Sequence, residues 1–150
     1  RVNTNYIVVQ SRNATLISKL IDGRFPDYER VIPKDNDKIV LMDTDLLRST
    51  VARAAILANE KYRGVRFEFE SNRLVVEAQN PEREQAREEM DIDYEGDSFS
   101  IGFNVGYVQE VLQHVESAET QWVMKDETSS GLVKAVGAND YQYVVMPMRL

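Results

Sequence analysis

Apolar and polar residues follow each other along the chain with periods that differ from segment to segment. Near the start, the β-branched and aromatic run Tyr6–Val9, the polar turn Ser11–Asn13 and a second apolar run over Ala14–Ile21 predict a β-hairpin. A glycine and two prolines follow within a short stretch. Because these residues interrupt regular structure, we expect a linker over about residues 22–35.

After this linker, the pattern predicts a strand, a helix and three strands. The first strand is expected at Lys38–Met42, and Asp43, Thr44 and Asp45 are candidates for the helix N-cap, with Asp45 preferred. Apolar residues at helical spacing predict a helix over Asp45–Ala58. The three strands that follow are expected at Val65–Glu70, Arg73–Gln79 and Gln85–Tyr94.

The same order of elements then occurs a second time. A strand is expected at Phe99–Phe103, Asn104 is the next N-cap candidate, and a helix is expected over Val105–Val115. Three more strands are expected at Thr120–Lys125, Leu132–Val136 and Tyr141–Met146. Two βαβββ units therefore predict an α+β fold, with two antiparallel sheets and both helices on one side.

Composition excludes several classes of function. The chain has no cysteine and a single histidine, so thiolate chemistry is excluded, and a catalytic triad or a metal site could use only His114. His114 lies near the end of a predicted helix, where a structural role is the usual one. No phosphate-binding glycine motif occurs, and no apolar run approaches the roughly 18 residues of a membrane helix. The start, Arg1–Thr4, is typical of a piece of a longer chain, and the lack of cysteine suits the cytoplasm.

The net charge of −7 is concentrated in one segment. Residues 82–97 hold eight acidic residues against two arginines, so this stretch accounts for −6 of the total. Such a stretch fits a basic partner surface or a role in solubility. A metal-dependent hydrolase is a weaker alternative, because Glu84, Glu88 and Asp91 are suitably spaced but no oxygen-rich loop accompanies them.

Three further features suggest contact surfaces. The apolar C-terminal run Tyr143–Leu150, with methionines on both sides of Pro147, is either a last core strand or the wall of a binding groove. Arg48 and Arg53 lie off the apolar stripe of the first helix and are either phosphate contacts or solvated charges. The neighbours Ile56 and Leu57 form an exposed apolar patch or lie buried under a loop.

Four collinear strings resemble the bacterial β sliding clamp family, the β subunits of DNA polymerase III. They are Ser18–Tyr28, Ala52–Arg66, Ile101–Val105 and the C-terminal run, and the resemblance extends without a gap from about residue 18 to the end. Members of this family have three similar domains and form head-to-tail dimeric rings around duplex DNA. The resemblance implies that residues 1–30 are the tail of a middle domain with its linker, and that residues 31–150 are the third domain.

The resemblance also implies a non-catalytic processivity factor of a DNA polymerase, without cofactor, metal or membrane contact. Its expected partners are duplex DNA, a second copy of the full-length subunit, and the polymerases, clamp loader and repair proteins that present short linear motifs. Arg48 and Arg53 are the candidates to face DNA, and Ile56, Leu57, Glu82, Glu84 and Glu88 are expected at the dimer contact, where Gln85 and Arg87 replace acidic residues often found there. The expected peptide-binding groove consists of Pro26, Arg30, Val31, Tyr62, Asn104, Tyr107, Thr128, Ser130, Val144, Val145, Met146, Pro147, Met148 and Arg149.

Thr128 departs from the aliphatic residue that is more usual in the family, so one wall of the groove is expected to be more polar. The other half of the groove belongs to the middle domain, so we expect this chain to bind such motifs weakly. Two alternatives stay open at this point: the hydrolase built on residues 82–97, and a generic protein-interaction domain with no role on DNA.

Overall fold

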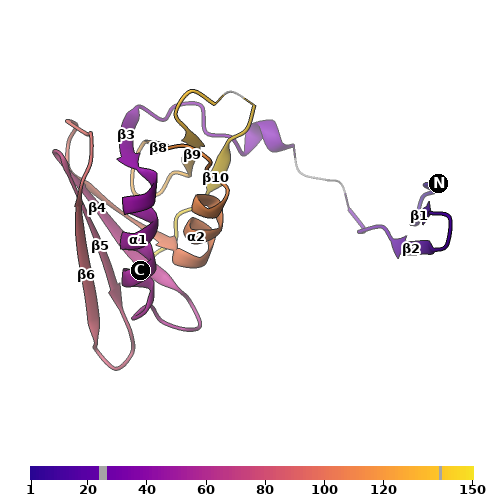
Figure 1. Ribbon diagram of the computed structural model, residues 1–150, viewed down its shortest axis with the longest axis horizontal. Helices are drawn as coiled ribbons and strands as arrows, with labels where there is room; N and C mark the ends of the chain where they lie inside the picture. Colours follow the sequence, from indigo (N-terminus) through magenta and orange to yellow (C-terminus); the bar gives the residue numbers. More distant parts are fainter. Residues whose placement is uncertain (24–26, 139) are drawn as a thin grey trace.

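A computed structural model describes residues 1–23, 27–138 and 140–150. The predicted order of strands and helices is confirmed, with one short 3-10 helix, η1, added after the hairpin (Figure 1). The elements are β1 (Tyr6–Gln10), β2 (Thr15–Lys19), η1 (Tyr28–Arg30), β3 (Lys38–Asp43), α1 (Thr44–Ala55), β4 (Gly64–Glu70), β5 (Arg73–Gln79), β6 (Gln85–Asp91), β7 (Phe99–Asn104), α2 (Val105–Gln113), β8 (Glu119–Met124), β9 (Gly131–Ala135) and β10 (Tyr143–Val145).

The first two strands form the predicted antiparallel hairpin, with Tyr6 opposite Lys19 and Gln10 opposite Thr15. The amide of Ser11 closes its turn by donating to the carbonyl of Ala14 at 2.9 Å. The strands leave large apolar side chains in solvent: Leu16 and Ile17 are each 64% exposed. A two-stranded hairpin without a covered apolar face is at best marginally stable by itself.

The other strands form two four-stranded antiparallel sheets, ordered β6-β5-β4-β7 and β10-β9-β8-β3. The first strand of each βαβββ unit therefore belongs to the sheet of the other unit: β3 pairs with β8, and β7 pairs with β4. This exchange interlocks the two units, so neither has a complete sheet without the other. The sequence pattern predicts the strands but not this exchange.

The two helices pack against each other, and each starts at a side-chain cap. Asp43 caps α1 by accepting from the amide of Leu46 at 2.7 Å, and Asn104 caps α2 by accepting from the amide of Gly106 at 2.9 Å. The preference for Asp45 as the first cap was wrong, because Asp45 lies inside the first turn of α1.

The helices and several strands end earlier than the sequence pattern suggests. After Ala55 the chain continues as a turn closed by hydrogen bonds between residues three apart, so the predicted end at Ala58 was wrong, and α2 ends at Gln113 instead of Val115. The strand expected to reach Tyr94 ends at Asp91, although Asp93 still bridges to Leu41 in the other sheet. The last strand covers Tyr143–Val145 only.

The core lies between the helices and the two sheets and is rich in aromatic rings. The strand β4 alternates strictly, so Phe67 and Phe69 point inward. The Trp122 ring of the other sheet is 5.7 Å from the Phe67 and Phe103 ring centroids, which joins the two sheets through one aromatic cluster. None of the helices in the described part of the chain is long and apolar enough to span a membrane.

Candidate functional site

A hollow of about 500 Å³ lies between α2 and the strand β10. It brings together four of the expected groove residues: Tyr107 from α2, and Val144, Val145 and Met146 from the end of the chain. Tyr107 and Met146 are 63% and 62% exposed and stand at its rim, while Val145 is buried. The hollow also uses residues that were not expected at the site, namely Glu110, Val111, His114 and Tyr143.

The walls of this hollow follow from local structure. The cap at Asn104 fixes where α2 begins, and this places Tyr107, Glu110, Val111 and His114 at intervals of three, one and three residues along the helix. Such intervals put side chains on one helical face. On the other side, β10 is held by pairing with β9, in which Val144 lies opposite Leu132.

Beyond β10, the last residues turn onto the outer side of the other sheet. The amide of Met148 donates to the carbonyl of Gly102 in β7 at 2.8 Å, and Leu150 packs over Gly64 in β4. There, Tyr62, Met148 and Arg149 line a second hollow of about 800 Å³ together with Arg66 and other residues of β4, β5 and β6. The C-terminal tail therefore separates two hollows instead of lining one.

Asn104 connects these two regions. Its side-chain oxygen caps α2, and its side-chain nitrogen donates to the carbonyl of Tyr62 at 3.4 Å. Neither Asn104 nor Pro147 lines either hollow. In this arrangement Asn104 positions α2 relative to the loop before β4.

Thr128 and Ser130 lie in the turn between β8 and β9, outside both hollows. The carboxylate of Asp126 accepts from the amide and hydroxyl of Thr128, both at 2.9 Å, and from the amide of Ser129 at 2.8 Å. Hydrogen bonds from Thr128 and Ser129 lower the pKa of Asp126 to about 2. The Thr128 hydroxyl that was expected to make the groove wall polar is therefore bound within the turn.

Arg30 and Val31 lie at the end of η1. Arg30 pairs with Asp27 at 3.3 Å, and Val31 caps the end of η1 with 38% of its surface exposed. Neither residue lines one of the two hollows. Pro26 lies outside the described residues.

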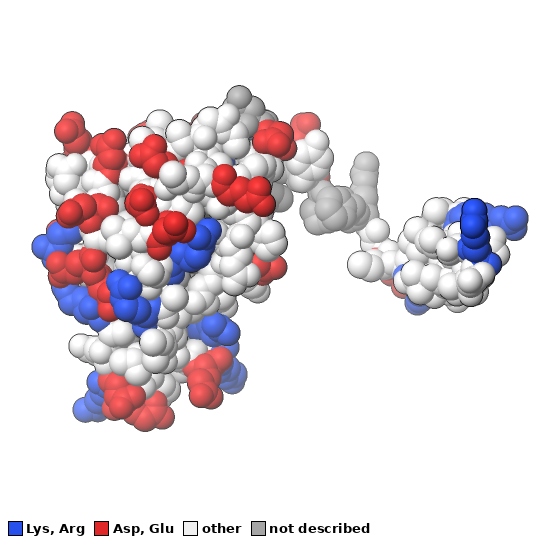
Figure 2. Space-filling view, viewed as in Figure 1, with Lys and Arg blue, Asp and Glu red and all other residues white. Residues whose placement is uncertain are grey.

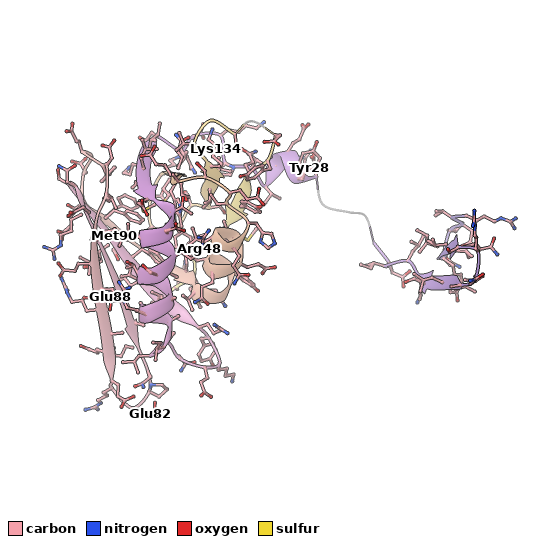
Figure 3. All side chains as sticks on the ribbon, in the orientation of Figure 1. Tyr28, Arg48, Glu82, Glu88, Met90 and Lys134 are labelled. Atoms are coloured by element: carbon pink, nitrogen blue, oxygen red, sulfur yellow. The ribbon has the colours of Figure 1, made fainter. Side chains whose placement is uncertain are left out.

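The residues expected at the dimer contact lie on two elements. Ile56, just after α1, is 78% exposed and Leu57 is half-buried. Glu82 lies exposed at the turn into β6 (Figure 3). Glu84 is exposed as well and accepts from the side chain of Asn80 at 2.6 Å. The remaining member, Glu88, is 2.8 Å from Arg53 of α1 in an ion pair.

Both arginines expected to face DNA make contacts within the protein. Arg48 donates to the carbonyls of Leu112 and Val115 at the end of α2, and Figure 3 shows it between the two helices. Arg53 pairs with Glu88. Their side chains are nevertheless 40% and 49% exposed. The face that carries α1 shows basic side chains among acidic ones, with acidic groups gathered toward its upper part (Figure 2).

The acidic stretch does not converge on a metal site. Within residues 1–23, 27–138 and 140–150, no group of three or more His, Cys, Asp or Glu side chains could hold a metal ion. Several acids are instead paired with arginines across the outer face of the sheet: Arg87 with Glu77 at 2.6 Å and Glu89 at 3.1 Å, and Arg73 with Glu89 at 3.0 Å. The hydrolase alternative thus has no support in the geometry.

Comparison with known proteins gives consistent matches. The family described as DNA polymerase III beta subunit, C-terminal domain, matches residues 29–149. The Beta sliding clamp of Pseudomonas putida is 50% identical over 136 residues, which are 91% of this chain and 37% of that protein. The Beta sliding clamp of Escherichia coli (strain K12) is 44% identical over 150 residues, which are 100% of this chain and 41% of that protein.

The fold agrees with solved structures as well. The crystal structure of the DNA polymerase sliding clamp from Pseudomonas aeruginosa matches with a TM-score of 0.88 and 44% identity, over 99% of this chain and 41% of that one. The Caulobacter crescentus structure titled pol III beta matches with a TM-score of 0.87 and 37% identity, over 99% of this chain and 40% of that one. This chain therefore spans about two fifths of the length of the proteins it matches.

Proposed function

Because the chain belongs to the DNA polymerase III beta subunit family, we propose that it is part of a sliding clamp, a non-catalytic processivity factor that encircles duplex DNA in the bacterial cytoplasm. Within the clamp, this part presents a groove for short linear motifs of DNA polymerases, the clamp loader and repair proteins. The observation that carries the proposal is the hollow between α2 and β10, which coincides with expected groove residues.

The chemistry of this hollow suits an apolar anchor. Val111, Val144 and Val145 supply apolar surface, and the exposed Tyr107 and Met146 flank it. A volume of about 500 Å³ lies within the usual range of ligand pockets. Aromatic and methionine side chains around an apolar floor are typical of sites that bind one or two large hydrophobic residues. A leucine–phenylalanine pair would fill such a site.

We assign the part of the expected groove beyond this hollow to the second hollow and to the segments around it. Met148, Arg149 and Tyr62 already share the second hollow, so a peptide that crosses the C-terminal tail would contact both. Arg30, Val31 and Pro26 belong to the part of the sequence that follows the hairpin, and Asn104, Thr128, Ser130 and Pro147 act through the backbone that they hold. A DnaN sliding clamp from Pseudomonas aeruginosa, similar to this chain, has been solved bound to griselimycin.

We further propose that residues 1–30 are the tail of a preceding clamp domain and that residues 31–150 form the third domain. The exposed apolar side chains of the hairpin support this division, because Leu16, Ile17 and Val9 would be covered in a complete domain. The third domain would meet the first domain of a second subunit through Ile56, Leu57, Glu82, Glu84 and Glu88. For Glu88 to meet a basic partner there, its pair with Arg53 must be shared or exchanged.

DNA is proposed to pass along the helices without base-specific contacts. Arg48 and Arg53 remain the candidates to approach phosphates, because both guanidiniums are partly exposed on α1. A chain with a net charge of −7 is compatible with this role, since a ring around DNA needs only a mildly basic inner surface.

The groove is tested by NMR titration of the labelled chain with a peptide of the Gln-Leu-x-Leu-Phe type. The same peptide with its Leu-Phe pair changed to Ala-Ala is the ligand control. We expect shifts to concentrate on Tyr107 and residues 143–149 with the first peptide only. If neither peptide moves these signals, the groove assignment fails.

A matched pair of valine variants tests the floor of the hollow. Val144→Ser removes apolar surface from the hollow and should weaken binding about tenfold or more, since burial of a valine side chain contributes roughly 1.5–3 kcal/mol. Val136→Ser makes the same change at a site that is 41% exposed and outside both hollows. Equal affinities of the two variants would contradict the assignment.

A further inference from the structure

The C-terminal tail lies across two glycines on neighbouring strands. Gly64 in β4 lies opposite Asn104, and Gly102 in β7 lies opposite Arg66. The two glycines are therefore diagonal neighbours on the same, outward face of the sheet, because side chains alternate along each strand. Met148 and Leu150 pack on this pair of positions.

Neither glycine has space for a side chain. A methyl group at Gly102 would lie 2.5 Å from the carbonyl oxygen of Met148 and 2.8 Å from Cγ of Leu150. A methyl group at Gly64 would overlap Cδ2 of Leu150 and lie 3.4 Å from Sδ of Met148. Their backbones do not require glycine, because the glycines with positive φ are Gly23 and Gly137. Glycine is therefore needed here for close approach of the tail.

The tail in turn sets one wall of the proposed groove. Val145 is fixed by the backbone pairing of β10 with β9, and Met148 is fixed by its hydrogen bond to Gly102. Met146 lies between these two fixed points, next to Pro147, whose ring restricts the backbone further. If the tail were released, Met146 would be held at one end only, and the wall would lose its defined position.

We propose that Gly64 and Gly102 form a seat for Met148 and Leu150, called here the glycine seat, and that this seat is a positioning device for the groove. The inference rests on the proposed function, because it assigns a role in peptide binding to two glycines through the tail that they hold, and Gly102 lines neither hollow. The two glycines differ in importance. At Gly102 the obstacle is the backbone of Met148, whereas at Gly64 it is the end of a flexible leucine side chain.

The test compares Gly102→Ala, Gly64→Ala and Gly131→Ala in the full chain, with two measurements on each. Gly131 is the matched control: it also lies in a strand, next to Val145, but a methyl group there would meet its nearest atom at 3.5 Å, an ordinary contact. The first measurement is the hydrogen-exchange rate of the Met148 amide. The second is the Kd for the Gln-Leu-x-Leu-Phe peptide.

We expect Gly102→Ala to speed exchange at Met148 and to raise the Kd, each about tenfold, with a smaller effect of Gly64→Ala and none of Gly131→Ala. Circular dichroism checks that the sheet persists. If Gly102→Ala unfolds the chain, Leu150→Ala tests the seat without changing the sheet, and it should raise the Kd as well. In the double variant Gly64→Ala with Leu150→Ala, the two effects should not add, because the obstructing side chain is gone.

The two proposals fail in distinguishable ways. Unchanged exchange at Met148 in Gly102→Ala and an unchanged Kd in Leu150→Ala would overturn the glycine seat, even if the native chain binds the peptide. Faster exchange at Met148 with an unchanged Kd would overturn its positioning role. If the native chain itself does not bind the peptide, the groove assignment fails, and the exchange rates alone decide whether the glycines hold the tail.

Discussion

Replacement of Arg48 in α1 should destabilise the protein, because this side chain donates hydrogen bonds to carbonyl groups at the end of α2. The last carbonyls of a helix have no partner within it. Two groups of the Arg48 guanidinium donate to the carbonyl of Leu112 in the last turn of α2, Nη2 at 2.8 Å and Nε at 3.3 Å. Nη2 also donates to the carbonyl of Val115, just after α2 ends, at 3.4 Å. The last turn of α2 contains no basic residue of its own, so Arg48 supplies the cation that this helix end favours.

The expected size of the effect follows from these contacts. A hydrogen bond from a charged group contributes about 1.5–3 kcal/mol, and a cation at a helix C-terminus about 0.3–1 kcal/mol. The Arg48 side chain is 40% exposed, and two of its three bonds to these carbonyls are long. Its fourth bond joins Asp45, whose side chain is 89% exposed, so it adds little and the lower part of this range applies. We expect Arg48→Met to lower the free energy of unfolding by about 2 kcal/mol, and Arg48→Lys by about 1 kcal/mol, because lysine keeps the charge but lacks the planar fork.

Urea denaturation at neutral pH measures both values. Arg66→Met is the control, since the Arg66 side chain is exposed and has no hydrogen bond or ion pair with any described residue, and the change should alter the free energy of unfolding by less than about 0.5 kcal/mol. The reasoning is refuted if Arg48→Met is as stable as the native chain, or if Arg48→Lys is unaffected. Stability must therefore be measured before any loss of DNA binding in an Arg48 variant is attributed to a phosphate contact.

Three further predictions concern other polar contacts. The hydroxyls of Thr44 and Thr120 are buried and bonded at 2.7 Å, so either Thr→Val change should cost about 1–3 kcal/mol in urea denaturation, and the double change less than the sum; additive costs would contradict this. In an NMR titration, the carboxyl of Asp126 should lose its proton near pH 2. The turn that it holds is therefore fully stabilised above the ordinary pKa of 3.8 and loses this stabilisation as the pH falls through about 2. A midpoint near 3.8 would refute the hydrogen-bonded turn. A double-mutant cycle on the partly exposed pair Arg53 and Glu88 should give only about 0.2–1 kcal/mol and less in high salt, whereas a larger, salt-independent value would contradict this expectation.

Much of the fold could be predicted from periodicity. The alternation in β4, with Val65, Phe67 and Phe69 buried, is visible in the sequence, and turn residues mark most strand ends correctly. The exchange of β3 and β7 could not be predicted, because each is a short apolar strand that fits either sheet. Which sheet each strand joins depends on the neighbours that the helices bring near it, and the local sequence does not show these neighbours.

The candidate site shows the same limit. The apolar C-terminal run is unusual enough to suggest a groove wall, and Val144, Val145 and Met146 do line a hollow. That the chain then turns onto Gly102, and that Arg48 reaches the end of α2, depend on elements about 50 or more residues away in sequence. Helical spacing shows that Arg48 lies off the apolar stripe, but it cannot show what lies opposite.

The exchanged strands also explain why the groove can be well defined although it lies at the end of the chain. One wall, α2, continues directly from β7, which belongs to the sheet of β4, β5 and β6. The other wall, β10, belongs to the sheet that contains β3. The tail beyond β10 then returns to β7 through the bond from Met148 to Gly102. Each wall is thus anchored in a different sheet and the tail connects them, so the groove can lose its shape only if an interlocked sheet opens or the tail leaves its seat.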